Sequence, residues 1–180
     1  NGLVGSEMCI RDRDKLGTVM ANYLNFQIES GAMVVQIFDS WVGALDIDDY
    51  NEYVYPHVEK MIQIVKGKNP NVPLISMGVH SAHLIPSLRK ANPDVIAIDW
   101  KTDLAKTWES LNYEVAVQGN LDPTALFADW SIIEAKTKKI LDSVKGKPGH
   151  IFNLGHGILP GTPVENVKRL CEFVHEYTRK

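Results

Sequence analysis

The sequence predicts an α/β protein with a parallel sheet, made of one helix followed by five repeats of strand, polar loop and helix. Five short apolar runs recur along the 180 residues, and polar residues follow each of them directly. Segments with apolar residues at three- and four-residue steps separate the runs, which is the pattern of helices with one buried face. No Gly/Ser-rich linker interrupts the series. We therefore expect one domain in which helices connect parallel strands.

The five predicted strands are largely continuous apolar runs, typical of strands that are buried on both faces. They are Met33–Phe38, Pro73–Gly78, Val95–Trp100, Glu114–Gln118 and Ile151–Leu154.

The first helix is predicted to begin at Asp14 and to end at Gly31, since glycine is favoured just after a helix. Its expected buried face consists of Leu16, Val19, Met20, Tyr23, Leu24 and Ile28. Residues 1–13 have no clear period and lack the apolar segment of a secretory signal. The run Val4–Arg13 looks like translated sequencing-adapter read-through. Residues 1–13 are thus expected to be a non-native or disordered extension, and the domain to occupy residues 14–180.

The later helices carry start and stop signals. Asp46 or Asp48 is the expected cap of the second helix, and Gly67 its end. Asp129 can cap a helix that Gly146 closes. The last helix has Thr162 as its expected N-cap, Pro163 in the first turn and Glu165 three residues after the cap, which predicts a capping box.

Composition narrows the function classes. The chain is 44% hydrophobic and 23% charged, with a net charge of -3 and no run of like charge, which argues against nucleic-acid or membrane-surface binding. No apolar run reaches the roughly 18 residues of a membrane span. The two cysteines, Cys9 and Cys171, are too far apart to suggest a zinc site or a disulfide framework. A cytoplasmic enzyme or binding protein is expected.

The triplet Gly155-His156-Gly157 follows the last predicted strand and places one imidazole between two glycines. In parallel α/β folds, ligands bind at the carboxyl ends of the strands. Glycine is also common in ordinary loops, so the triplet alone does not decide between a site and a loop.

The other strand ends are polar as well. If the strands are parallel, their polar side chains converge on one rim, and these are Asp39, Ser40, His80, Ser81, Asp99, Lys101, Gln118, Asn120, Asn153 and His156. Local loop or cap hydrogen bonds are the competing role for each, above all for Asp99 and Asn120. His80 and His83 lack a clustered carboxylate or cysteine, so a metal site there is not expected.

Five βα units suit an open doubly wound sheet or part of a (β/α)₈ barrel, which takes about 250 residues when complete. Neither Gly-x-Gly-x-x-Gly after a strand nor Gly-Lys-Ser/Thr is present, which disfavours nucleotide binding. Ser40 has no Gly-x-Ser-x-Gly surroundings, which disfavours acyl transfer.

Four motifs together resemble the uroporphyrinogen decarboxylase family from about Asp14 to Lys180. They are Gln36–Gly43, Ile98-Asp99-Trp100, Val117–Pro123 and Asn153–Gly157, in that order. The resemblance implies the later part of a (β/α)₈ TIM barrel. It also implies a carboxy-lyase of tetrapyrrole and heme synthesis, which removes the four acetate carboxyls of uroporphyrinogen III without metal or organic cofactor and yields coproporphyrinogen III. A cytoplasmic homodimer is implied for the full-length protein.

Residue by residue, the resemblance assigns Ser40 and His156 to substrate binding, with His156 also catalytic, and Phe38 to the cleft wall. A hydroxyl and an imidazole suit a polycarboxylate, and protonated histidine adds charge complementarity. The family's arginines, its pyrrole-binding aspartate and its tyrosine belong to an earlier half without counterpart in this chain. Around Gly78 the family usually has Lys-Gly, where this chain has Val79-His80. The 180-residue chain alone is therefore expected to be inactive.

Two alternatives remain. A cobalamin-dependent methyltransferase of the same superfamily would use zinc and His-x-Cys, whereas this chain has His80-Ser81-Ala82. A non-catalytic half-barrel could instead bind a partner or dimerise through its open strand edges.

Overall fold

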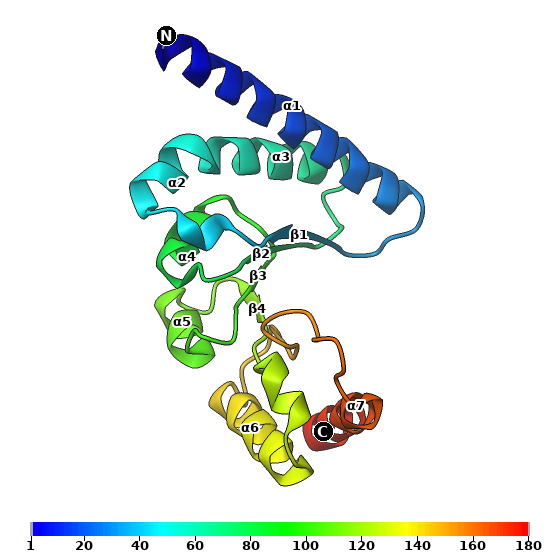
Figure 1. Ribbon diagram of the computed structural model, residues 1–180. Helices are drawn as coiled ribbons and strands as arrows, with labels where there is room; N and C mark the ends of the chain where they lie inside the picture. Colours follow the sequence, from blue (N-terminus) through cyan, green and yellow to red (C-terminus); the bar gives the residue numbers. More distant parts are fainter. Residues whose placement is uncertain (1, 180) are drawn as a thin grey trace.

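A computed structural model describes residues 2–179, with side chains from residue 10 onward (Figure 1). All five predicted strands are present and form one parallel sheet in the order β1-β2-β3-β4-β5. Their bounds are β1 Val35–Asp39, β2 Leu74–Gly78, β3 Val95–Ala97, β4 Ala116–Gln118 and β5 His150–Ile151. β3 and β5 end three residues earlier than predicted, where the chain turns into the rim loops, whereas β1, β2 and β4 begin one or two residues later than predicted.

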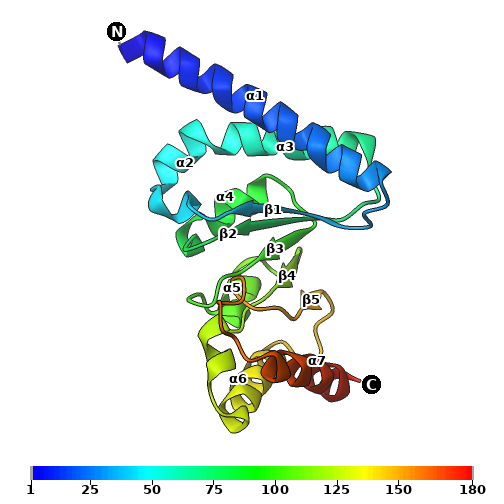
Figure 2. The same cartoon turned by 45° about the vertical axis from the view of Figure 1, so that its right-hand side comes forward.

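Seven α-helices and three 3₁₀ helices alternate with the strands of the described chain. The α-helices are α1 Gly2–Glu29, α2 Ile47–Tyr53, α3 Tyr55–Lys68, α4 Ile85–Lys90, α5 Leu104–Ser110, α6 Trp130–Ser143 and α7 Val164–Thr178. The 3₁₀ helices are η1 Val42–Ala44, η2 Ala82–Leu84 and η3 Pro123–Phe127. Figure 2 shows α3 and α7 at opposite ends of the row of strands, with α4 and α5 along one side.

Strand order and curvature identify the sheet as part of a barrel. A doubly wound sheet reverses its strand order at a switch point, whereas these strands follow the chain order throughout. On a flat sheet, β1 and β4 would lie roughly 14 Å apart, three spacings of about 4.8 Å. Nevertheless Gln118 Nε2 of β4 donates a hydrogen bond to Gln36 Oε1 of β1, at 3.4 Å. The sheet therefore curls strongly, as the expected (β/α)₈ barrel segment requires.

The apolar core lies between the strands and the helices that follow them. One cluster joins α1, α3 and α4 to β1 and β2, and includes the buried Val65 and Leu74. A second places the buried Trp108 of α5 against β3 and β4, where its indole Nε1 donates to Val115 O at 2.7 Å. A third holds α6, α7 and η3 together around Ile133 and Leu126. Every helix of the described residues is too short or too polar to span a bilayer.

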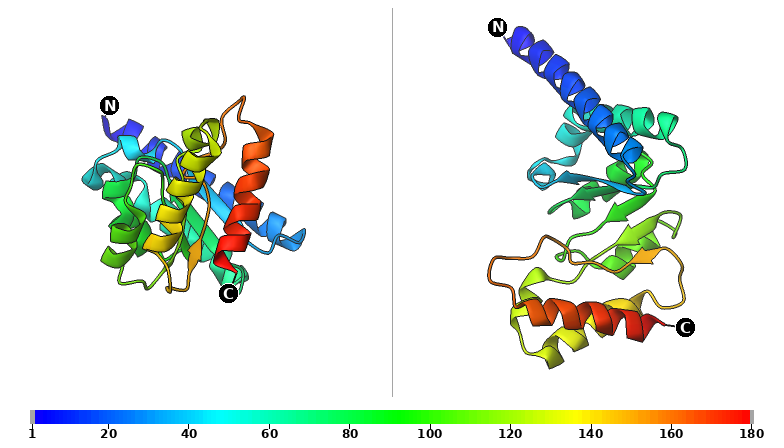
Figure 3. Two further views of the ribbon diagram at one scale, coloured as in Figure 1. Left: turned by 90° about the horizontal axis from the view of Figure 1, so that it is seen from below. Right: turned by 90° about the vertical axis from the view of Figure 1, so that its right-hand side faces the viewer.

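The first helix is longer than expected. A non-native or disordered extension was predicted for residues 1–13, and the structure continues α1 through this stretch to Gly2; Asn1 lies outside the described residues. Those residues include helix-compatible side chains and continue the register of the helix behind them. Figure 3 shows this part of α1 projecting from the body. Arg13 and Asp14 contact α2 and α3, where Arg13 lies over the Tyr53 ring and Asp14 binds His57 and Lys60. That residues 1–13 are non-native stays a prediction.

The expected buried face of α1 is only partly correct. Leu24 is buried and Ile28 packs against the core, but the side of α1 that meets α3 centres on Ala21, which is fully buried, and Asn25. The small alanine permits close helix packing, and Asn25 Oδ1 accepts a hydrogen bond from Asn69 Nδ2 at 2.8 Å. A stripe of apolar side chains faces outward instead, made of Leu16, Val19, Met20, Tyr23 and Phe26.

The predicted helix signals have mixed outcomes. Asp46 caps α2, with its Oδ1 accepting from Asp49 N at 2.8 Å. The helix expected to stop at Gly67 runs to Lys68 and is closed by Asn69. The capping box of the last helix is wrong: Pro163 is the N-cap, and Thr162 Oγ1 donates to Leu159 O within the preceding turn. Proline at the cap fixes the backbone there, so the threonine hydroxyl serves the turn instead.

Candidate active site

A cavity of about 390 Å³ lies between the two edges of the curled sheet, at the carboxyl ends of the strands. It brings together Phe38, Ser40 and His156, the three side chains that the family resemblance assigned to a substrate site. Phe38 lies in β1 and Ser40 directly follows it, while His156 follows β5, more than 100 residues later. The remaining lining residues are Gln36, Asp39, Met77, Val79, Asn153, Leu154, Gly157 and Ile158. The roles of the three residues stay predictions, but their proximity is a property of the fold.

The loop after β1 is held by Asp39, which leaves Ser40 free to face the cavity. Asp39 Oδ1 accepts hydrogen bonds from the backbone N–H of Trp41 at 3.2 Å and of Val42 at 2.9 Å. This is the local loop role that short acidic side chains often take. Ser40 is exposed, and Phe38 is 69% exposed, which is high for an aromatic ring on a strand. An apolar ring and a hydroxyl therefore stand side by side on one wall.

The opposite wall is the Gly155-His156-Gly157 turn. Gly155 N–H donates to Leu121 O at 2.8 Å, and a Cβ at Gly155 would overlap the backbone of Trp100. Only glycine allows the two loops to approach this closely. A Cβ on Gly157 would meet no atom within 4 Å, so the close approach concerns the first glycine alone. His156 itself is exposed, and its ring lies edge-on to Trp100 with centroids 5.7 Å apart.

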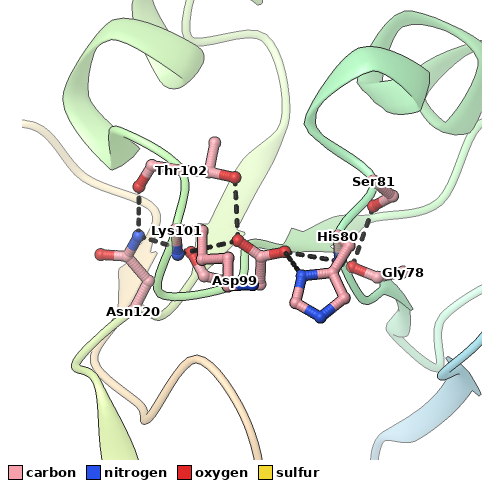
Figure 4. A network of polar contacts seen from close by, with 7 residues as sticks. All are labelled: Gly78, His80, Ser81, Asp99, Lys101, Thr102 and Asn120. Atoms are coloured by element: carbon pink, nitrogen blue, oxygen red, sulfur yellow. Dashed lines mark hydrogen bonds and ion pairs between the residues drawn. The ribbon is translucent and has the colours of Figure 1, made fainter. Parts of the chain in front are cut away.

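Asp99 and Asn120 occupy the same rim but form a closed structural network (Figure 4). Asp99 is 2% exposed, and its carboxylate accepts from His80 N–H, Lys101 N–H and Thr102 Oγ1 at 2.6, 3.0 and 2.9 Å. Asn120 Nδ2 donates to the carbonyl oxygens of Asp99 and Thr102. A buried carboxylate with three hydrogen bonds is satisfied. The network therefore fixes the loops after β2, β3 and β4.

Other rim residues also have local partners. Ser81 Oγ donates to Gly78 O at 2.9 Å, and a ring nitrogen of His83 lies 2.8 Å from Leu45 O. Asn153 lines the cavity while its Oδ1 accepts from Leu154 N–H. Gln118 points into the barrel interior toward Gln36.

Trp100 is the rim residue that sequence reasoning undervalued, because packing was its expected role. It lies edge-on to both His156 and His80, and the Lys101 ammonium is 5.5 Å from its ring centroid. Its position between polar residues after a strand was the available signal. Among residues 10–179, no group of three or more His, Cys, Asp or Glu side chains is placed to hold a metal ion.

Burial alters the titration of His150, at the start of β5. Desolvation lowers the pKa of His150, and a ring nitrogen lies 2.8 Å from Gly119 O, a contact that partly opposes the shift. Burial likewise raises the pKa of Tyr50 in α2 to about 12. Neither residue lines the cavity between β1 and β5.

Comparison with known proteins places these features in one family. The family model described as "Uroporphyrinogen decarboxylase (URO-D)" matches residues 13–177. Proteins named uroporphyrinogen decarboxylase from Roseiflexus sp. and Koribacter versatilis are 49% and 48% identical to the chain. The alignments cover 92% and 91% of this chain and 48% and 46% of those proteins. The chain thus spans about half the length of the curated relatives it matches.

A solved structure supports the barrel reading of the fold. A methyltransferase from Methanosarcina mazei superposes with a TM-score of 0.76 over 92% of this chain and 48% of that one. Its sequence identity is 21%, so the likeness concerns the fold alone. The family match extends over most of the chain, and the strand-end motifs lie on one rim of the sheet. The chain therefore belongs to the uroporphyrinogen decarboxylase family.

Proposed function

We propose that this chain supplies part of the active site of a uroporphyrinogen decarboxylase, which removes the four acetate carboxyls of uroporphyrinogen III and releases coproporphyrinogen III. The observation that carries the proposal is the cavity that joins Phe38, Ser40 and His156 across the two edges of the sheet. Family membership and the names of the relatives support the choice of substrate. The full-length protein is proposed to act as a homodimer.

The reaction requires the protein mainly to bind the substrate and to transfer protons. Protonation of a pyrrole carbon next to an acetate arm creates an electron sink, into which the carbon–carboxyl bond can release its electron pair as CO₂ leaves. A general acid must then return a proton to the methylene carbon, and the ring carbon must lose the proton that it received, so that the pyrrole regains its aromaticity. His156 is exposed at the cavity wall and carries a ring that can bind a carboxylate or donate a proton. Ser40 can hydrogen-bond a carboxylate, and Phe38 can pack against a pyrrole ring.

The isolated 180-residue chain is proposed to be inactive, because it supplies only one side of the cleft. An assay for coproporphyrinogen with the isolated chain should show no turnover. Fusing the unmatched amino-terminal part of the Koribacter versatilis relative to Asp14 should create activity. His156→Asn in that fusion should lower kcat/KM by at least 10²-fold, within the range of acid–base groups. Turnover by the isolated chain would refute inactivity, and an inactive, folded fusion would count against the decarboxylase proposal.

The methyltransferase alternative draws on the fold similarity to the Methanosarcina mazei protein. It would require zinc held partly by cysteine after a strand, and the chain has Ser81-Ala82 after His80. Metal analysis of purified protein separates the two proposals. Stoichiometric zinc would favour the methyltransferase.

A non-catalytic interaction module is the third candidate. Its support is the apolar surface of α1 and of the β1 edge, where Met33 and Trp41 are both 85% exposed. Open strand edges and apolar patches favour association. Light scattering combined with a tetrapyrrole titration distinguishes this role, since a pure interaction module should associate without binding tetrapyrrole.

A further inference from the structure

His80, at the end of β2, has an unusual backbone conformation. Its φ is 55°, in the left-handed region that residues other than glycine adopt uncommonly, asparagine, aspartate and histidine more often than the rest. Its N–H donates to Asp99 Oδ2 at 2.6 Å, and the buried Asp99 is itself fixed by Lys101 and Thr102. Backbone strain that the surroundings hold in place is concentrated at functional sites. The side chain of His80 is therefore a candidate for a functional role.

The imidazole of His80 lies beside the same carboxylate. Its Nδ1 lies 4.0 Å from Asp99 Oδ2, and the side chain is 47% exposed. Figure 4 shows Nδ1 turned toward Asp99 and the second ring nitrogen turned away from it. In its protonated form the ring can point one N–H toward Asp99 and offer the other to an incoming anion.

The Trp100 ring lies between the rings of His80 and His156, and His156 lines the cavity. The ring centroids of His80 and Trp100 are 5.5 Å apart, and those of Trp100 and His156 are 5.7 Å apart. With the Lys101 ammonium 5.5 Å from the same indole, three groups able to carry positive charge surround one aromatic ring. We name His80, Trp100, Lys101 and His156 the Trp100 cluster. Only His156 of this cluster also lines the Ser40 cavity.

The loop carrying His80 packs directly on the loop carrying Ser40. A Cβ at Gly43, just after Ser40, would collide with the carbonyl oxygens of Val79 and His80. Glycine is needed for this contact, and it ties the two loops together. His80 is thus part of the same rigid rim as the cavity.

We propose that His80 is a further substrate-binding residue, which receives a carboxylate of the tetrapyrrole beside Trp100 while the Ser40 cavity holds another part of the molecule. The proposal rests on the proposed function and deepens it. A tetrapyrrole carries carboxylates around its whole periphery, so one cavity of about 390 Å³ accommodates only part of it. The Trp100 cluster presents the complementary charge next to that cavity.

The test is a fluorescence titration of the chain with uroporphyrin III, the oxidised form of the substrate. His80→Asn removes the imidazole but keeps a residue that tolerates positive φ. His83→Asn is the matched control, because His83 is also an exposed histidine near the end of β2 and contacts Leu45 O. The dissociation constant should rise about 10-fold for His80→Asn, the size of one charge-assisted hydrogen bond. It should change less than about 2-fold for His83→Asn.

The outcomes separate this proposal from the proposed function. Unchanged binding by His80→Asn, alongside weaker binding by His156→Asn, would overturn the role of His80 and leave the decarboxylase site intact. Absence of binding by the unaltered chain would count against both. If His80→Asn lowers the thermal midpoint, the unaltered protein still gives a test by diethyl pyrocarbonate labelling and mass spectrometry. Uroporphyrin should protect His80 more than His83, and equal labelling of His80 with and without uroporphyrin would overturn the proposal.

Discussion

Asp99 and Asn120 lie on the same rim of the sheet as Ser40 and His156, yet the two pairs have different surroundings. The first pair is buried, and its polar atoms hold neighbouring backbone groups. The second pair is exposed and faces a cavity. A polar side chain at a strand end can therefore stabilise the rim or be available to bind a ligand. Side chains of the first kind form hydrogen bonds within the protein, and those of the second kind face the cavity. Four predictions test this distinction.

The largest effect is expected at Asp99. Asp99→Ala leaves the N–H groups of His80 and Lys101 and the Thr102 hydroxyl without their acceptor. These three donors are partly buried, and each one left without a partner costs about 1 kcal/mol or more, so the free energy of unfolding should fall by about 3 kcal/mol or more. Urea denaturation measures it. Asp103→Ala, which removes the exposed N-cap of α5, is the control and should cost about 1 kcal/mol. Equal losses would show that Asp99 has no special structural role.

The next largest effect on stability is expected at the two glycines beside His156, where the same substitution should have different costs. Gly155→Ala places a methyl group against the Trp100 backbone, and such overpacking costs about 1–3 kcal/mol of unfolding free energy. Gly157→Ala meets open space, so its effect should stay within about 0.5 kcal/mol. Thermal or urea unfolding of both variants provides the comparison. A larger loss for Gly157→Ala would contradict the loop geometry.

A smaller effect concerns pH and His150. Burial lowers its pKa in the folded protein below the ordinary value of 6.5. As the pH falls below that value, the unfolded chain takes up a proton that the folded chain still resists, and stability is lost. Above it, the ring is neutral in both states and the contribution is complete. Unfolding free energies at pH 7.5 and pH 5.5 should differ less for His150→Gln than for the unaltered chain; an unchanged difference would exclude His150 as the cause.

The smallest effect on stability is expected at Ser40, which faces the cavity. Ser40→Ala should change the unfolding free energy by less than about 0.5 kcal/mol, as exposed substitutions usually do. If Ser40 binds the substrate, the same variant should weaken uroporphyrin binding about 5-fold, the value of one hydrogen bond near 1 kcal/mol. Destabilisation without a change in affinity would show that Ser40, like Asp99, stabilises the rim and does not bind the ligand.

The sequence predicted the parallel sheet and its strand ends because those features depend on local residue pattern. The apolar runs at residues 74–78 and 95–97 became buried strands, and Asp46 became a cap as expected. Motif order also pointed to the barrel, which strand order and the Gln36–Gln118 contact support. The residues proposed for the site, Phe38, Ser40 and His156, were brought to one cavity.

Other features depend on contacts between distant segments and were not predicted. The apolar period of α1 could not show which side meets α3, and the small Ala21 and the Asn25–Asn69 bond decided it. Whether Asp99 binds a ligand or stabilises the rim depends on its hydrogen-bond donors, His80 N–H and Thr102 Oγ1, which come from two separate loops. The left-handed conformation of His80 could not be predicted from the residue type, because histidine adopts it more often than most residues but still at only a few positions.

The contact between Gln36 and Gln118 also has a consequence for how deeply a ligand can enter the interior of the sheet. These two amides meet across the interior, and Gln36 together with Met77 lines the inner side of the cavity. The cavity consequently has a floor made of side chains from β1 and β2. Under the proposed function, this floor limits how deeply an acetate arm of the substrate can enter the interior of the sheet.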